Sequence, residues 1–431
     1  MTLFGNILFI FITLSLDRSI YRCYFDYTEE IDRKVYIGTI TISLIVVSSF
    51  FTIFLFVLKD YVSLIFISIP FYPYYSISII TSYIIIIYSI AKIFLQITEQ
   101  SRKFVTYSIV YFMIDLLLTI VFVVFLHKGA IGKMYATLIA GLVFLPISGK
   151  VIIQYATFKF NWGMLKSSLK YSLPVIPTLL SAWVLNLSDR IFIERYFSLA
   201  DVGIYSMGYK LADTLLIFSV GFFTAYSPLF FKTAISVLDS DENNILISIN
   251  NQFVLAILLV SSIAFMVAEE VVTILLDPKY YESYLIFKLI IVGYVFHIIF
   301  GLVNSSFAQG KKMITMMFIN LGSAILNIAL NMTLIPTYGI YGAAYATIIS
   351  FAIFGIVKYS FARSYYFIEW QWKKIFKYVT MIIASYMLSE YISSDNMMLT
   401  LLIKLMIILF VIMYYWYDNK QIIYGIRNYN Y

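Results

Sequence analysis

The chain has 431 residues, of which 62% are hydrophobic and 12% are charged, and its mean hydropathy is +0.90. Soluble domains carry about 25% charged residues, so this composition excludes a soluble enzyme and predicts an integral membrane protein. The net charge is +7, but the basic residues lie between apolar runs, which argues against nucleic acid as a partner.

Side chains suited to metal or redox chemistry are scarce. Cys23 is the single cysteine of the sequence, which excludes an internal disulfide, and the two histidines, His127 and His297, are too isolated to form a metal site. The sequence also contains no phosphate-binding glycine loop, zinc motif or nucleophile triad. We therefore expect no metal, no cofactor and no enzymatic activity.

Apolar segments recur from one end of the chain to the other. A transmembrane helix needs about 20 predominantly apolar residues. Thirteen segments of this kind are centred near residues 12, 47, 86, 115, 143, 185, 219, 262, 296, 323, 352, 382 and 407. The sequence therefore predicts an all-α polytopic membrane protein with about 13 transmembrane helices.

The first segment ends in charged residues. Asp17, Arg18 and Arg22 follow its apolar run. Because Arg18 and Arg22 are four residues apart, they can line the same interior face of a helix. Arg22 also fits a residue of the cytoplasmic interface, and that alternative is the stronger one for it.

The sixth segment begins with two prolines. Pro174 and Pro177 suit the first turn of a helix, where the backbone N–H groups have no intrahelical acceptor. We expect a helix that begins near Leu173 and continues to about Tyr196. Roughly 24 residues of helix are enough to cross the hydrocarbon core.

Polar residues lie inside this expected helix. Trp183, Asn186 and Arg190 share one face, and Asp189 is beside them. A charge near the centre of a bilayer costs about 2.5–3.5 kcal/mol on insertion scales. We therefore expect Asp189 and Arg190 to face a bundle interior or a water-filled cavity.

The next helix repeats the pattern. Ser206, Lys210 and Asp213 share a face, and the spacing of Lys210 and Asp213 predicts an i,i+3 pair. Such a pair fits an intrahelical ion pair better than a proton relay. Two consecutive helices thus turn ionisable groups inward.

Two parts of the sequence align with each other. Residues 100–103 match residues 309–312 at an offset of 209, and the pattern from Gly129 to Thr137 recurs from Gly339 to Thr347 at an offset of 210. Repeats of this length predict two pseudo-repeated, parallel lobes. We expect an N-terminal lobe over 1–160, a C-terminal lobe over 161–368, and two additional helices with a cytoplasmic tail over 369–431.

The same offset predicts that the N-terminal lobe is incomplete. The second half starts near Leu173, and the equivalent point of the first half would fall before Met1. The first helix of this lobe is therefore expected to be missing, either because the start site is misassigned or because the gene is a truncated copy.

The basic residues between segments are distributed unequally. With alternating loops, one side carries 20 Lys and Arg, the other carries six, and the remaining four of the 30 lie within segments. The six are Lys59, Lys128, Lys133, Arg195, Lys279 and Lys288. The positive-inside rule makes the richer side cytoplasmic, which predicts a cytoplasmic C-terminus.

Several motifs resemble those of a known family. The runs SLPVIP (residues 172–177), LNLSDR (185–190) and VGIYSMGYK (202–210) are similar to bacterial polysaccharide (O-antigen) flippases. These flippases belong to the multidrug/oligosaccharidyl-lipid/polysaccharide exporter superfamily, which also contains multidrug antiporters and lipid II flippases. The resemblance continues at residues 308–312 and 338–347.

The resemblance implies a substrate and a place for it. The substrate would be an undecaprenyl-pyrophosphate-linked oligosaccharide, moved across the bacterial inner membrane between two lobes that switch access. The implied partners are this lipid-linked oligosaccharide, membrane lipid, a polysaccharide polymerase and a chain-length regulator. A drug or lipid II transporter of the same superfamily is the near alternative. A polysaccharide polymerase is disfavoured because every predicted outer loop is short.

Interior cations would hold the pyrophosphate. Arg190, beside Asp189, is the first candidate, because a planar guanidinium matches phosphate geometry, and a structural ion pair is the alternative. The full set of candidate binding residues is Arg18, Arg22, Asn186, Asp189, Arg190, Lys210 and Asp213. Asp115 and Glu269 are weaker candidates for coupling to a proton or ion gradient, with snorkelling to the membrane surface as the alternative.

Overall fold

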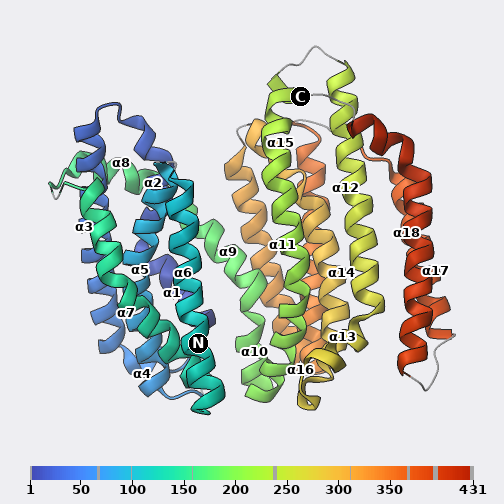
Figure 1. Cartoon of the computed structure of the whole chain (residues 1–431), viewed down its shortest axis with the longest axis horizontal. Helices are drawn as coiled ribbons and strands as arrows, with labels where there is room; N and C mark the ends of the chain where they lie inside the picture. Colours follow the sequence, from blue (N-terminus) through green and yellow to red (C-terminus); the bar gives the residue numbers. More distant parts are fainter. Residues whose placement is uncertain are drawn as a thin grey trace. The chain divides into compact units, whose positions relative to one another are not determined.

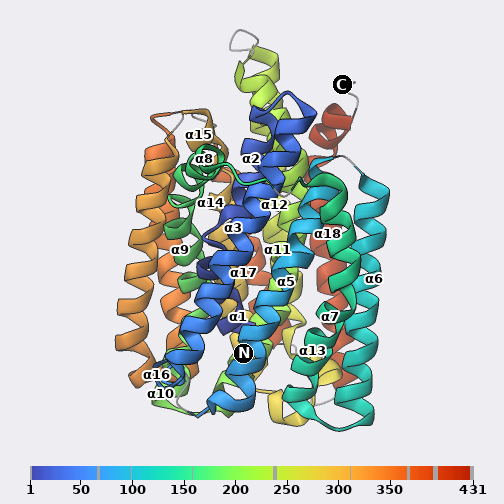
Figure 2. The same ribbon diagram turned by 90° about the vertical axis from the view of Figure 1, so that its left-hand side faces the viewer.

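The computed structural model describes residues 2–65, 68–98, 100–157, 159–235, 240–310, 312–365, 369–391 and 397–427, and within them the regular elements are all helical. The helices group into two compact units, Met1–Trp183 and Val184–Tyr431. Figures 1 and 2 show the helices of each unit running roughly side by side. The expected all-α polytopic fold is confirmed.

The first unit is built around α5 and α7. Its elements are α1 (Thr2–Thr13), α2 (Leu16–Cys23), η1 (Tyr24–Asp26), α3 (Glu30–Val57), α4 (Lys59–Val62), η2 (Phe71–Tyr75), α5 (Ser76–Ile97), α6 (Ser101–Thr119), η3 (Ile120–Phe125), α7 (Gly129–Tyr155), α8 (Trp162–Ser172) and the first part of α9 (Val175–Leu187). Helix α5 packs against α7, α1 and α3. Ile79, Phe94 and Phe144 are fully buried in this packing.

The second unit is built around α14. Its elements are the end of α9, α10 (Asp189–Tyr196), α11 (Leu199–Ile235), α12 (Ser240–Met266), α13 (Ala268–Leu275), η4 (Pro278–Tyr280), α14 (Ser283–Gly301), α15 (Asn304–Gln309), α16 (Met313–Ala362), α17 (Trp372–Tyr391) and α18 (Met397–Arg427). Helix α14 packs against α11, α12 and α16, and its Ile290 and Tyr294 are buried at these contacts.

Eight of the described helical segments are long and apolar enough to cross a membrane, and two bent helix pairs add up to two more. Helix α16 has 50 residues and is broken at Gly339, where the backbone is not helical. Its two parts, 313–338 and 340–362, are about 39 and 35 Å long at 1.5 Å per residue, and each exceeds a hydrocarbon core of about 30 Å. Helix α16 therefore supplies two spans, as its two sequence segments predict. The total of about 13 spans stays a prediction.

The repeat is visible in the backbone. Gly129 and Gly339, which align at an offset of 210, both have left-handed φ angles, of 56° and 59°. Gly132 and Gly342 also correspond, because each lies against a backbone carbonyl. A Cβ added at Gly132 would lie 2.9 Å from the carbonyl oxygen of Phe122, and one added at Gly342 would lie 2.2 Å from the carbonyl oxygen of Leu334. Both glycine pairs let two helices turn tightly. Two pseudo-repeated lobes are thereby confirmed.

The boundaries of the lobes differ from the boundary between compact units. Contacts divide the chain between Trp183 and Val184, because α8 packs on α2 and α3 of the first unit. The expected lobe limits at 160/161 and 368/369 stay predictions.

Candidate substrate site

The helix expected over Leu173–Tyr196 is broken, which corrects the sequence prediction. Helix α9 ends at Leu187 and α10 begins at Asp189, with a bend of 43° between them. At the break, the Ser188 hydroxyl donates to the Val184 carbonyl, at 2.7 Å. Ser188, Asp189 and Arg190 therefore lie at the junction of two helices and not on one face of a continuous helix.

Arg190 replaces a backbone donor that the break removes. In an unbroken helix its N–H would bond to the carbonyl of Asn186. Here that N–H donates to Asp189 Oδ1, at 3.0 Å, and the guanidinium Nη1 donates to the Asn186 carbonyl instead. Arg190 therefore caps the end of α9 from inside the protein.

Asp189 holds this arrangement together. Its Oδ1 lies 2.7 Å from Arg190 Nη1, and its Oδ2 accepts from the Tyr205 hydroxyl of α11. Asp189 is 1% exposed and Arg190 is 4% exposed. An aspartate in the first turn of α10 also interacts favourably with the helix dipole. The pair is thus buried, mutually neutralised and hydrogen-bonded.

Aromatic rings surround the guanidinium. The Arg190 Cζ lies 4.9 Å from the ring centroid of Tyr205 and 4.1 Å from that of Tyr209, distances at which cation–π attraction operates. The Tyr209 hydroxyl donates to Asn186 Oδ1, at 3.3 Å. Arg190 therefore ties α9, α10 and α11 together.

The network extends to α14. The Tyr294 hydroxyl donates to Asp213 Oδ1, at 2.6 Å, and the rings of Tyr209 and Tyr294 are in edge contact. Four predicted site residues, Asn186, Asp189, Arg190 and Asp213, are therefore brought together in one polar network of the second unit. Asn186 and Asp213 are half-buried, so they form its more accessible part.

The expected i,i+3 pair of Lys210 and Asp213 is not formed among the described residues, because Asp213 accepts from Tyr294 instead. Lys210 is exposed. Lys210 directly follows Tyr209 of the network in α11, and it is an accessible cation.

The first unit holds Arg18, Arg22 and Asp115. Arg18 lies in α2, is exposed and is 3.6 Å from Asp17, whereas the side chain of Arg22 lies outside the described part of the chain. Asp115 of α6 pairs with Lys133 of α7 and accepts from the Thr137 hydroxyl, at 2.9 Å.

Lys133 and Thr137 also line a cavity of about 270 Å³ between α1, α5 and α7. The hydroxyls of Ser78, Thr81 and Ser82 belong to the same lining. Asp115 is therefore part of a polar region of the first unit and not an isolated, snorkelling carboxylate.

Glu269 and Glu270 have different surroundings. Glu269 is exposed and lines a cavity with Lys288. Glu270 is buried and forms an ion pair with Lys404 of α18, at 2.7 Å. Sequence reasoning missed this pair, although a lone lysine in the apolar run of α18 signals that a partner must exist.

The three tyrosines of the network were also missed. The sequence contains 38 tyrosines, and nothing in the pattern separates Tyr205, Tyr209 and Tyr294 from the rest. Among the described residues, no group of three or more His, Cys, Asp or Glu side chains could hold a metal ion.

A family model described as polysaccharide biosynthesis protein matches residues 1–285, about two thirds of the chain. The chain belongs to this polysaccharide biosynthesis family. This family match confirms the resemblance to proteins of polysaccharide biosynthesis. A search among curated proteins found no match.

Solved structures of a lipid II flippase and of multidrug transporters have a similar fold. The lipid II flippase MurJ in an inward closed conformation has a TM-score of 0.66 at 15% identity, covering 96% of this chain and 92% of its own. An inward-facing multidrug resistance MATE family transporter of the MOP superfamily has a TM-score of 0.66 at 13% identity, and the similarity covers 84% of this chain and 87% of the transporter. The Vibrio cholerae MATE transporter VcmN in its bent form has a TM-score of 0.51 at 16% identity, and the similarity covers 84% of this chain and 85% of VcmN. At such identities the similarity shows the fold.

Proposed function

We propose that the chain is a flippase that moves an undecaprenyl-pyrophosphate-linked oligosaccharide, the repeat unit of an O-antigen or capsule, across the bacterial cytoplasmic membrane. The observation that carries the proposal is the combination, in one chain, of a polysaccharide biosynthesis family match and the fold of a lipid II flippase. Polysaccharide biosynthesis requires lipid-linked sugars to cross the membrane, and a multi-pass membrane protein of that family is suited to this step.

The accessible polar groups of the second unit suit such a substrate. Lys210 is an exposed cation for a phosphate, and Asn186 and Asp213 are half-buried acceptors and donors for sugar hydroxyls. Asp189 and Arg190, which are buried, position the tyrosines of the network. A rearrangement of the bend at Ser188 would be required before Arg190 could reach a phosphate itself.

The first unit contributes its own candidates. Arg18 is exposed on α2 and can attract a phosphate. Arg22 is proposed for the same role, because it follows Arg18 by four residues and can share its helix face. Asp115 is the better placed coupling group, since it pairs with Lys133 and accepts a hydrogen bond from Thr137, and both residues line a polar cavity. Asp115→Asn is expected to abolish any dependence of export on the proton or ion gradient.

Complementation tests the function. Expression of the full chain in a strain that lacks its polysaccharide flippase is expected to restore surface glycan and to reduce the lipid-linked oligosaccharide that accumulates inside. Restored growth in a strain depleted of its lipid II flippase, or efflux of cationic dyes without glycan export, would assign the chain to one of the alternative transporters. Restored polymer length in a polymerase-deficient strain would instead support the hypothesis that the chain is a polysaccharide polymerase.

A matched pair of variants tests the proposed cation. Lys210→Gln is expected to lower glycan export about tenfold at equal protein level, because a charge-assisted hydrogen bond to phosphate is lost. Lys150→Gln removes an exposed lysine from α7 and is expected to leave export unchanged. Equal export by the two variants would remove Lys210 from the site.

A further inference from the structure

A cavity of about 550 Å³ in the second unit is lined by tyrosines and by charges of both signs. Its polar lining consists of Glu269, Tyr284, Lys288, Tyr341, Tyr345 and Tyr386. These residues come from α13, α14, α16 and α17. None of them belongs to the network around Arg190, so the cavity needs an explanation of its own.

Lys288 is the cation of this cavity. It is 7% exposed, and its Nζ lies 5.3 Å from the ring centroids of Tyr284 and Tyr386 and 5.5 Å from that of Phe265. The rings shield the ammonium from water, which strengthens its attraction for an anion. Glu269, an exposed carboxylate, supplies the opposite charge in the same lining.

Lys288 and Glu269 lie near the helix ends that one loop connects, which is where we expect lipid head groups. Lys288 is five residues after the start of α14 at Ser283, and Glu269 is six residues before the end of α13 at Leu275. At 1.5 Å per residue these separations are about 8 and 9 Å. The loop at residues 276–282 connects these helix ends, and Figure 1 shows α13 at the lower end of the second unit. Tyrosines concentrate at the same depth in membrane proteins.

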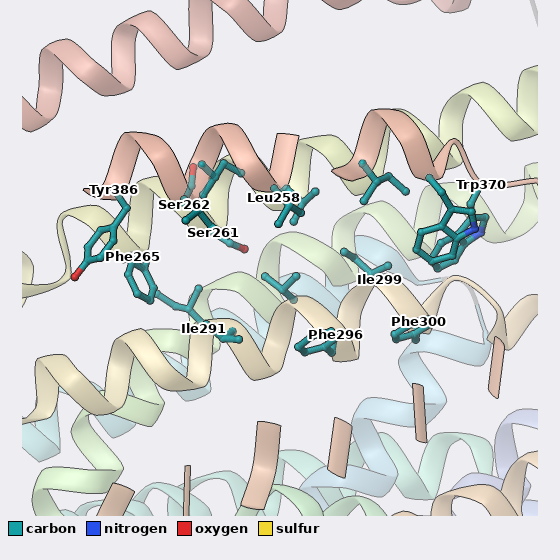
Figure 3. A pocket seen from close by; sticks show the side chains of 17 residues that line it. Leu258, Ser261, Ser262, Phe265, Ile291, Phe296, Ile299, Phe300, Trp370 and Tyr386 are labelled. Atoms are coloured by element: carbon teal, nitrogen blue, oxygen red, sulfur yellow. The ribbon is translucent and has the colours of Figure 1, made fainter. Parts of the chain in front are cut away.

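A second cavity adjoins the first. It has a volume of about 470 Å³, lies between α12, α14 and α17, and is almost wholly apolar. Both cavities are lined by Phe265 and Tyr386, whose rings are in edge contact. Figure 3 shows these two rings at one end of the apolar cavity and Trp370 at the other. Together the two cavities fit a molecule with a polar head and a long apolar chain.

We propose that the cavity around Lys288 binds the head group of an amine-bearing, zwitterionic membrane phospholipid. Lys288 takes the phosphate, Glu269 and the tyrosine faces take the ammonium, and one acyl chain enters the apolar cavity. A head group with only negative charge leaves Glu269 next to an anion, and a free phosphate leaves the apolar cavity unused. This lipid site goes beyond the proposed function and holds whichever substrate the chain moves.

Lipid retention by the purified full chain tests the site. Native mass spectrometry is used to titrate the protein in detergent with phosphatidylethanolamine and with phosphatidylglycerol of identical chains. The wild type is expected to retain phosphatidylethanolamine preferentially. Lys288→Gln is expected to weaken that binding about tenfold. Lys279→Gln, which removes an exposed lysine of the same loop, is the matched control and is expected to bind like the wild type.

Glu269→Gln is the second variant, and since Glu269 is exposed it carries little risk of misfolding. It is expected to bind both lipids with similar affinity, because the partner of the ammonium is gone. The proposal is overturned if Lys288→Gln and Lys279→Gln retain lipid equally, or if Glu269→Gln keeps the wild-type preference. It is also overturned if glycerophosphoethanolamine, which has no chains, competes as well as the lipid, or if undecaprenyl phosphate binds this site more tightly.

Discussion

Arg190 combines two contacts that a lysine could not make together. Its planar guanidinium donates to the Asn186 carbonyl and to Asp189 while it faces the rings of Tyr205 and Tyr209. Both the hydrogen bonds and the stacking depend on the break before α10. A residue that a sequence pattern marks as a binding group is therefore also part of the architecture.

Arg190→Ala is expected to lower the stability of the protein. It leaves the buried Asp189 without its cation, which costs about 3–5 kcal/mol. The measurement is the melting temperature and yield of the purified variant, followed by fluorescence-detected size-exclusion chromatography. An unchanged melting temperature would show that Asp189 has another partner for its charge.

A double variant separates stability from substrate contact. Asp189→Asn with Arg190→Gln removes both charges, so no uncompensated charge stays buried, and we expect its yield to exceed that of Arg190→Ala. Glycan export by the folded double variant then reports on contact alone. Export at the wild-type rate would restrict Arg190 to a structural role, and loss of export would support contact with the pyrophosphate.

The ion pair of Glu270 and Lys404 allows a similar comparison. Lys404→Met leaves the carboxylate of Glu270 buried and alone, which is expected to cost about 3–5 kcal/mol, whereas Glu270→Gln with Lys404→Met is expected to be close to neutral. Thermal melting of the two purified variants is the check. Equal melting temperatures would mean that the charge on Glu270 does not depend on Lys404.

At the residue scale, sequence could identify charges but not their partners. Asp189 and Arg190 were predictable because a charge in an apolar run must face inward. The partners were not, because Lys404 is 134 residues from Glu270 and Tyr205 is one tyrosine among 38. Contact across such distances depends on how helices pack, which periodicity within one helix does not contain.

At the scale of elements, the two aligned glycines set the helix hairpins. Gly339 has φ 59° and ψ −141°, a conformation that is essentially restricted to glycine. Gly339→Ala is expected to destabilise the second unit by about 1–3 kcal/mol. Gly149→Ala in α7, where an added Cβ meets nothing within 4 Å, is the control and is expected to be neutral or stabilising. Similar melting temperatures for both variants would contradict this role of Gly339.

Helices were easier to predict than their breaks. Apolar runs about 20 residues long indicate spans directly, and the repeat predicted that Gly129 and Gly339 occupy equivalent positions in two lobes. The break at Ser188 was not predictable, because neither Pro nor Gly lies there. It is stabilised by hydrogen bonds of the Asp189 and Arg190 side chains, and Tyr205 and Tyr209 of α11 add further contacts.

At the scale of the whole molecule, the charge distribution predicts orientation. A reporter that is active only in the periplasm is expected to stay silent when fused after Tyr431, because the basic loops hold that end in the cytoplasm. The same reporter inserted after Asp277, between α13 and α14, is expected to be active. Strong activity at Tyr431 would reverse the topology.

The two-lobe fold was predictable from the repeat and the resemblance, but the identity of the proposed glycan substrate was not. Sugar hydroxyls are recognised by amide, hydroxyl and carboxylate groups, and such groups occur in many helix bundles for packing alone. Asn327 and Asn331, which hydrogen-bond to each other inside α16 at 3.1 Å, illustrate this ambiguity.

The buried ion pair also has a consequence for biogenesis. Helix α13, which carries Glu270, is synthesised before α18, and the ribosome must add 134 residues before Lys404 exists. At 5–20 residues per second this delay is roughly 7–27 s. During that time the nascent second unit holds a carboxyl group without its cation, so α13 and α18 are joined after translation has passed both. A ribosome that stalls between them leaves Glu270 without the cation that neutralises it in the folded protein.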